Sequence, residues 1–305
     1  MQKDHTGGEP NVGAVIALDH MGVLRAHGPD TVRFLQGQLS HDISKLSPER
    51  SLLTGYHNPQ GRAIALLRLV YAGADDVLAI LPRELIPTVV SRLSKFVLRS
   101  KVKIVDASAE WTVSGHMEPP AHPAGTASAL ATTRAADAAR GSTLTARVDS
   151  SPRVLVLQHS TAAGDRPRDD RDVWHRLDIA AALPQVYAST SEEFVAQMLN
   201  LDVLDGIAFD KGCYTGQEVI ARAHYRGKVK RRLQRFVTAA PVSPGAGGQL
   251  ADGRSFKVVD AVPLPDGRYE FLAVAPVAAG TPDDLPSSAP VTAADSLPLP
   301  YELPA

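Results

Sequence analysis

Cysteine is nearly absent from the sequence, and neither sign of charge dominates. The 305 residues include one cysteine, and 32 Lys and Arg stand against 33 Asp and Glu, which gives a net charge of −1. A single thiol excludes an intramolecular disulfide, a zinc finger, and a permanent iron–sulfur cluster held by four thiolates of this chain. The balanced charge argues against a general nucleic-acid coat, so contact with nucleic acid would need a local basic patch.

Long apolar runs are also missing. No segment approaches the roughly 20 consecutive apolar residues of a membrane-spanning helix. Residues 1–13 are polar and charged, without the apolar segment and small-residue cleavage site of a signal peptide. We therefore expect a cytoplasmic protein without a membrane partner. The hydrophobic fraction of 44% is normal for a globular chain, and the length predicts two or three domains.

The apolar pattern predicts an α+β fold with mostly antiparallel sheets. Between residues 22 and 105, apolar spacing indicates a strand, a helix, further strands, a second helix and a last strand. After Gly227, three strands separated by turn residues predict a small β-barrel or sandwich. Residues 119–143 are rich in Ala, Thr and Gly without a period, as is typical of an insert within the second domain. The expected domains are 1–110, 111–227 and 228–305.

Two Thr-x-x-Glu motifs predict helix starts. In this motif the threonine hydroxyl accepts a hydrogen bond from a free backbone N–H, and the glutamate reaches back to the threonine amide. One motif is formed by Thr190 and Glu193, and the other by Thr215 and Glu218. We expect a helix to begin at each threonine.

The single cysteine, Cys213, stands just ahead of the second predicted helix. Unpaired N–H groups at a helix start favour an anion, and Lys211 adds a nearby positive charge. Both effects favour the thiolate, which is the nucleophile and the metal ligand. The alternative is a well-capped turn with a buried, inert cysteine and a surface lysine. The residues alone do not decide between the two interpretations.

The segment 211–218, Lys-Gly-Cys-Tyr-Thr-Gly-Gln-Glu, matches letter for letter the signature of the YgfZ family, bacterial relatives of the glycine-cleavage T-protein. Weaker matches are Phe-Leu-Gln-Gly-Gln-Leu at 34–39, Asn-Pro-Gln-Gly-Arg at 58–62 and Leu-Arg-Ser-Lys-Val at 98–102. The chain resembles the family over nearly its whole length, the insert excepted.

The resemblance implies a T-protein-like fold, with two α+β domains and a C-terminal β-barrel around a central channel that binds tetrahydrofolate or a derivative. It also implies an accessory role in the assembly, repair or maintenance of iron–sulfur enzymes, including enzymes that methylthiolate tRNA. Cys213 would be the key functional residue, with Lys211 as its important neighbour. The partners would be iron–sulfur client enzymes or cluster-assembly factors, with Cys213 at most a transient cluster ligand.

By resemblance, Trp174 stands where the family has a folate-lining tryptophan, although a core aromatic is the alternative. Met21 replaces a second such tryptophan, and methionine packs against a ring less specifically. Further folate contacts are expected from the signature and the helix after it, at Tyr214, Gln217, Glu218, Arg222 and Arg226.

Two further functions stay open beside the accessory role. A tetrahydrofolate-dependent one-carbon transferase fits the fold, but the T-protein's pair of aspartates is replaced by Ala65-Leu66. No carboxylate remains there to handle a proton, which argues against glycine cleavage. An RNA-binding factor for tRNA modification is suggested only by the basic segment 222–235, whose arginines and lysines surround His224 and Tyr225. The alternative for most of that segment is a solvated strand face.

Overall fold

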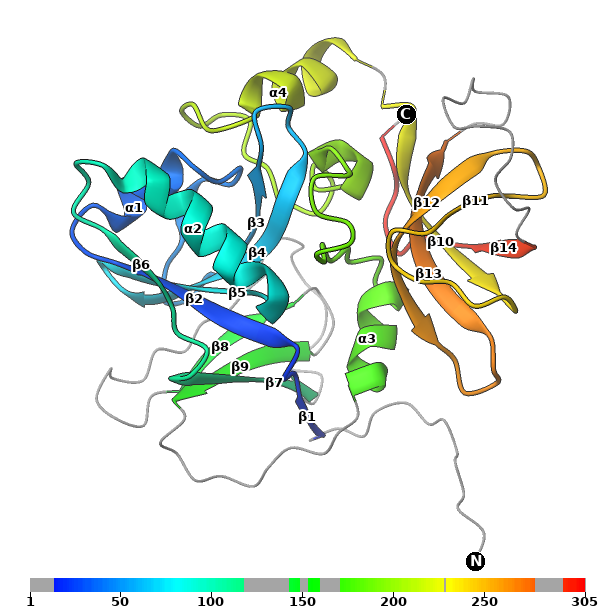
Figure 1. Ribbon diagram of the computed structural model, residues 1–305, viewed down its shortest axis with the longest axis horizontal. Helices are drawn as coiled ribbons and strands as arrows, with labels where there is room; N and C mark the ends of the chain where they lie inside the picture. Colours follow the sequence, from blue (N-terminus) through cyan, green and yellow to red (C-terminus); the bar gives the residue numbers. More distant parts are fainter. Residues whose placement is uncertain are drawn as a thin grey trace, which may run out of the picture.

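Three antiparallel sheets form the protein (Figure 1). The computed structural model describes residues 14–117, 143–148, 153–159, 171–227, 229–277 and 293–304. The expected insert 119–143, apart from Thr143, lies outside the described residues, as does Lys228. Among the helices of the described ranges, none is long and apolar enough to span a membrane.

The first sheet is covered on both faces. Its strand order is β3-β4-β5-β2-β6, with β2 (Met21–His27), β3 (Leu52–His57), β4 (Ala63–Gly73), β5 (Asp76–Pro82) and β6 (Lys103–Asp106). Because successive side chains point to opposite faces, Leu24 and Leu81 enter the largest core, whereas Val23 and Ile80 face the second sheet. This double burial explains why β4 is apolar almost throughout.

The two helices expected in the first domain are confirmed. The first is α1 (Thr31–Gln36), which is followed by a short 3₁₀ turn, η1 (Ile43–Lys45). The second is α2 (Ile86–Val97), which is preceded by the 3₁₀ turn η2 (Arg83–Leu85). On α2, Ile86, Val89 and Leu93 are buried at helical spacing. The helix lies along the first sheet through this apolar side (Figure 1).

The second sheet includes a strand from the start of the chain. Its order is β1-β7-β9-β8, with β1 (Val15–Ala17), β7 (Trp111–Met117), β8 (Thr143–Arg147) and β9 (Arg153–His159). The described part of the chain therefore passes through this sheet at β1 before it enters the first sheet at β2. Helix α3 (Arg171–Ala180) follows and lies between the second and third sheets (Figure 1).

The third sheet forms the C-terminal part and curls into half a barrel (Figure 1). Phe236, Phe256 and Phe271 stack in its core. A β-bulge between Val258 and Asp260 interrupts the pairing of its second strand. In the order β11-β12-β13-β10-β14, the strands are β10 (Arg231–Thr238), β11 (Gly247–Gln249), β12 (Ser255–Pro263), β13 (Tyr269–Pro276) and β14 (Ala294–Leu297).

The prediction that a helix begins at Thr190 is wrong. The Thr190 hydroxyl accepts a hydrogen bond from the N–H of Tyr187, which precedes it, at 2.9 Å. The Glu193 carboxylate pairs with Lys257 of the third sheet instead of reaching back along the chain. Only a short 3₁₀ turn, η3 (Ala196–Leu199), forms downstream, because a local turn engages Thr190 and a tertiary contact engages Glu193.

The second predicted helix forms, but it begins later than expected. Helix α4 (Gln217–Arg226) has Gly216 at its N-cap, and no side chain caps it. The Glu218 carboxylate accepts a hydrogen bond from Arg222 one turn later, at 3.2 Å. The predicted capping role of Thr215 is therefore wrong. The left-handed backbone of Gly216, with φ of 83°, makes the turn into the helix instead.

Candidate functional site

Cys213 is exposed on the loop that leads into α4. This loop packs on the β3–β4 turn: a Cβ added to Gly216 would lie 2.5 Å from the carbonyl oxygen of Asn58. Across the same contact, a Cβ on Gly61 would approach Val219 to 3.2 Å. Two segments that resemble the family in sequence, 58–62 and 211–218, therefore form one surface that presents the thiol.

Lys211 anchors this loop to the end of α1. Its Nζ donates hydrogen bonds to the carbonyl oxygens of Gln36 (2.7 Å), Leu39 (2.7 Å) and His41 (2.9 Å). Burial lowers the pKa of Lys211 to about 8. The ammonium also lies 5.0 Å from the ring centroid of Tyr214. Because an ammonium has three N–H groups, all of its donors are engaged by the backbone.

The electrostatic setting of Cys213 differs from the expected one. The thiol stands three residues ahead of the N-cap Gly216, and the influence of a helix dipole falls off within its first turn. Lys211 directs its three N–H groups at carbonyls on the α1 side. The arrangement therefore favours access to the thiol and a fixed loop more than a direct charge contact.

Helix α4 lies mostly in solvent. Ile220 is its buried residue, whereas Arg222 and Arg226 are exposed and Tyr225 is 68% exposed. The ring of His224 stacks on Phe209, with centroids 3.7 Å apart, and Tyr225 meets both rings edge-on.

Three arginines of the basic segment beyond α4 are engaged in structure. Arg232 is buried in an ion pair with Asp202, and Arg235 pairs with Glu270 within the third sheet. Arg231 donates hydrogen bonds to Ser255. The segment predicted as one basic patch is thus divided, and among its described residues those of α4 and Lys230 are presented to solvent.

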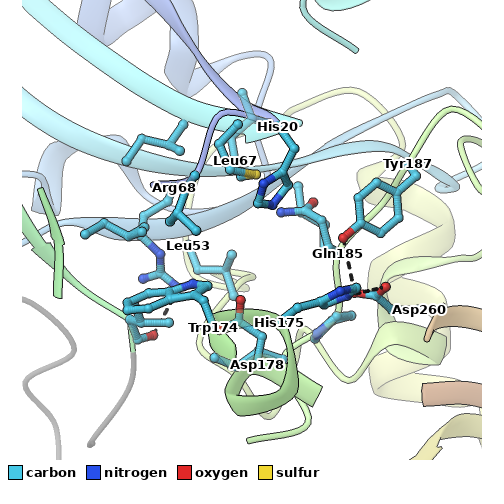
Figure 2. A pocket seen from close by; sticks show the side chains of 18 residues that line it. His20, Leu53, Leu67, Arg68, Trp174, His175, Asp178, Gln185, Tyr187 and Asp260 are labelled. Atoms are coloured by element: carbon cyan, nitrogen blue, oxygen red, sulfur yellow. Dashed lines mark hydrogen bonds and ion pairs between the residues drawn. The ribbon is translucent and has the colours of Figure 1, made fainter. Parts of the chain in front are cut away.

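A separate cavity lies where the three sheets meet (Figure 2). It encloses about 770 Å³ of empty space, part of it open to solvent. Trp174 and Met21 both line it, so the structure brings together these two expected folate contacts. The five other expected contacts, which lie in the loop before α4 and in α4 itself, do not line it.

Trp174 forms one wall of the cavity and is also a core residue. It is only 3% exposed, and its ring lies flat on Gly115 of β7, where an added Cβ would come within 2.3 Å of the ring. The guanidinium of Arg153 lies 5.1 Å from the ring centroid and pairs with Asp178 at 2.7 Å. Trp174 is therefore a core residue that also lines the cavity, and its contact with folate stays a prediction.

The opposite wall is polar, and sequence reasoning missed it. His175 Nε2 lies 2.7 Å from Asp260 Oδ1, and the Tyr187 hydroxyl donates to Asp260 Oδ2 at 3.3 Å. Burial opposes charge on His175, but the hydrogen bond and charge of Asp260 raise its pKa. His20 also lines the cavity, and burial, with Arg171 and His175 nearby, lowers its pKa to about 4. No local motif announces this wall, since its residues are far apart in the chain.

The described residues contain no group of three or more His, Cys, Asp or Glu side chains arranged to hold a metal ion.

Comparisons with known proteins identify the relatives of the chain. No family model matches it. The tRNA-modifying protein YgfZ of Yersinia pseudotuberculosis serotype O:1b (strain IP 31758) is 32% identical over 280 residues, which cover 83% of this chain and 81% of the relative. The chain belongs to the YgfZ family. The protein of the same name from Pectobacterium carotovorum is 34% identical over 254 residues, covering 77% and 74% of the two chains.

Among solved structures, the glycine cleavage system aminomethyltransferase T from Bartonella henselae superposes with a TM-score of 0.67. The match covers 88% of this chain and 80% of that one, at 13% sequence identity. This likeness confirms the T-protein-like fold expected for a member of the YgfZ family, and at that identity it concerns the fold alone.

Proposed function

We propose that the chain is a cytoplasmic, folate-binding accessory protein that supports tRNA-modifying iron–sulfur enzymes through Cys213. The observation that carries the proposal is the exposed thiol on a loop fixed from two sides, by Lys211 and by the β3–β4 turn. A fixed, accessible thiol suits a transient or shared ligand to a cluster completed by another molecule. The name of the YgfZ relatives supports the link to tRNA modification.

The cavity fits the ring system of a folate. Its lining combines apolar side chains with a few polar groups, as is usual for small-molecule sites. Trp174 and Met21 offer apolar surface to a flat ring, and His20 and His175 in the same cavity offer hydrogen-bonding groups. Tetrahydrofolate or a derivative is therefore the proposed cofactor.

Folate binding is tested by titrating the protein with 5-formyltetrahydrofolate and following tryptophan fluorescence. The chain has two tryptophans, and Trp111 does not line the cavity, so W111F is a matched control for W174F. We expect quenching in the wild type and in W111F, and loss of most of it in W174F. Equal quenching in both variants, or none in the wild type, would contradict folate binding in this cavity.

A one-carbon transferase is the weaker candidate. Ala65 and Leu66, which replace the T-protein aspartates, are buried in β4, and Leu66 lines the cavity. An apolar surface at that place offers no proton acceptor. Incubation with methylenetetrahydrofolate and a broad set of acceptors, followed by mass spectrometry, is expected to give no transferred product.

Direct contact with tRNA is a second candidate supported by α4. Tyr225 is exposed beside Arg222 and Arg226, a combination that can stack on bases and pair with phosphates. Gel shifts with tRNA at physiological salt test it, with Y225A set against Y269A, a tyrosine of the third sheet. Loss of a specific shift in Y225A alone would support contact through α4, and no shift with the wild type would reject it.

A further inference from the structure

Three distant segments supply the polar wall of the cavity. His20 comes from the turn before β2, His175 from α3, and Asp260 from β12 of the third sheet. The β-bulge between Val258 and Asp260 shifts the register of β12 at this point. In Figure 2, Trp174 and Arg68 lie on one side of the cavity and Tyr187 and Asp260 on the other, with His20 and His175 between them.

Asp260 makes His175 a hydrogen-bond donor with a defined orientation. The carboxylate is nearly inaccessible, and its oxygens accept from His175, Tyr187 and the N–H of Ala261. A buried carboxylate requires such partners, and a cationic imidazole satisfies it best. Since Nε2 of His175 is engaged, its Nδ1 is the nitrogen left for a ligand, and no described residue occupies it.

The pKa of His20 is lowered, whereas that of His175 is raised. His20 lies in the same cavity, and its buried Nδ1 has no hydrogen-bond partner among the residues that the structure describes. Burial first, and then Arg171 and His175, lower the pKa of His20, whereas Asp19 raises it. A neutral imidazole has one donor and one acceptor nitrogen, so His20 can either donate a hydrogen bond to a ligand or accept one from it.

We propose that His175 and His20 together determine the ligand specificity of this cavity, with His175 donating to a carbonyl oxygen of a flat heteroaromatic ring and His20 pairing with a ring nitrogen. The inference rests on the proposed folate function, because the 4-oxo pteridine ring carries both groups. A 4-amino pteridine lacks the oxygen acceptor and places a donor opposite the donor of His175. Folic acid and its 4-amino analogue aminopterin therefore form a matched pair of probes.

Charge on His175 should make binding depend on pH. Against the effect of burial, Asp260 raises the pKa of His175, so the imidazole keeps its proton to higher pH than an ordinary histidine, and the Nδ1 donor is lost as pH rises through that pKa. Tyr187 stays neutral throughout, because burial first, and then the charge of Asp260, raises its pKa far above neutrality. The other charged or titratable groups around His175 are Arg171, Asp172 and Asp178 on α3, Asp260 on β12, Arg68 on β4, and His20.

The experiment is calorimetric titration with folic acid and with aminopterin between about pH 6 and about pH 8.5. The proteins are the wild type, H175Q, H20L and D260N, with H27Q as a control because His27 lies on β2 outside the cavity. Circular dichroism confirms that each variant is folded. H175Q also reports how much of the pH dependence belongs to the ligand's own titration.

We expect the wild type and H27Q to prefer folic acid by about tenfold or more and to lose affinity as pH rises. H175Q should lose the preference and the protein's share of the pH dependence, and H20L should bind more weakly. D260N should move the loss of affinity to lower pH, because it removes the charge that holds the proton on His175. If H175Q does not fold, the pH at which D260N loses affinity for folic acid tests the role of His175 instead: a shift to lower pH supports it, and no shift contradicts it.

The failures are distinguishable. If the wild type binds folic acid but H175Q and H20L keep its affinity, preference and pH profile, the two histidines do not set specificity, and the folate function stands. If the wild type binds neither probe at any pH but binds 5-formyltetrahydrofolate, the inference is overturned and the folate function stands; if it binds none of the three, both are overturned.

Discussion

Replacing Lys211 with methionine removes the anchor between the Cys213 loop and α1 but keeps a side chain of similar length. The ammonium makes three hydrogen bonds of 2.7, 2.7 and 2.9 Å to carbonyl oxygens. A hydrogen bond to a charged group contributes about 1.5–3 kcal/mol, and the burial that lowers the pKa of Lys211 to about 8 offsets part of the sum. We expect K211M to destabilise the closed loop by about 2–4 kcal/mol, which is about 30- to 900-fold in the opening equilibrium.

Two local measurements test this magnitude, since a chain with three sheets is not expected to unfold in one step. One is hydrogen exchange of the amides in 37–41 and 211–216, and the other is the alkylation rate of Cys213. K230M is the matched control, because Lys230 is exposed and its side chain has no partner among the described residues. If exchange and alkylation in K211M equal those in K230M, Lys211 does not hold the loop, and our account of the signature segment is wrong.

Two further substitutions test the supports of the cavity and the third sheet. G115A should destabilise the protein by about 1–3 kcal/mol and weaken folate binding, because its Cβ would lie 2.3 Å from the Trp174 ring. Thermal melting and folate titration measure the two effects, and G212A is the control, because no atom lies within 4 Å of a Cβ added there. R232M should lower stability by about 3–5 kcal/mol, because it leaves Asp202 buried without its partner, whereas R268M, at an exposed pair, should change it by less than about 1 kcal/mol in urea unfolding.

The spacing of apolar residues predicted two kinds of element: helices that bury one side, and strands that are buried on both faces. Helix α2 was found because Val89 and Leu93 recur at helical spacing, and β4 because both of its faces are buried. The Thr190 motif failed because its local pattern cannot report that Glu193 pairs with Lys257 on a distant strand. Short polar motifs are the signals that tertiary contacts override most easily.

The candidate site divides in the same way. The signature segment and Trp174 were found by resemblance, but the role of Lys211 depends on carbonyls some 170 residues earlier in the chain. The wall formed by His20, His175 and Asp260 could not be predicted, since three sheets must assemble before its residues meet.

The central claim is that the Cys213 thiol carries the function. The most direct measurement is the level of methylthiolated tRNA nucleosides, by mass spectrometry, in cells that lack this protein and are complemented with the wild type, C213A or G212A. Wild type and G212A should restore the modification, and C213A, expressed at an equal level, should not. Full restoration by C213A would contradict the claim and leave the folate cavity and α4 to explain the function.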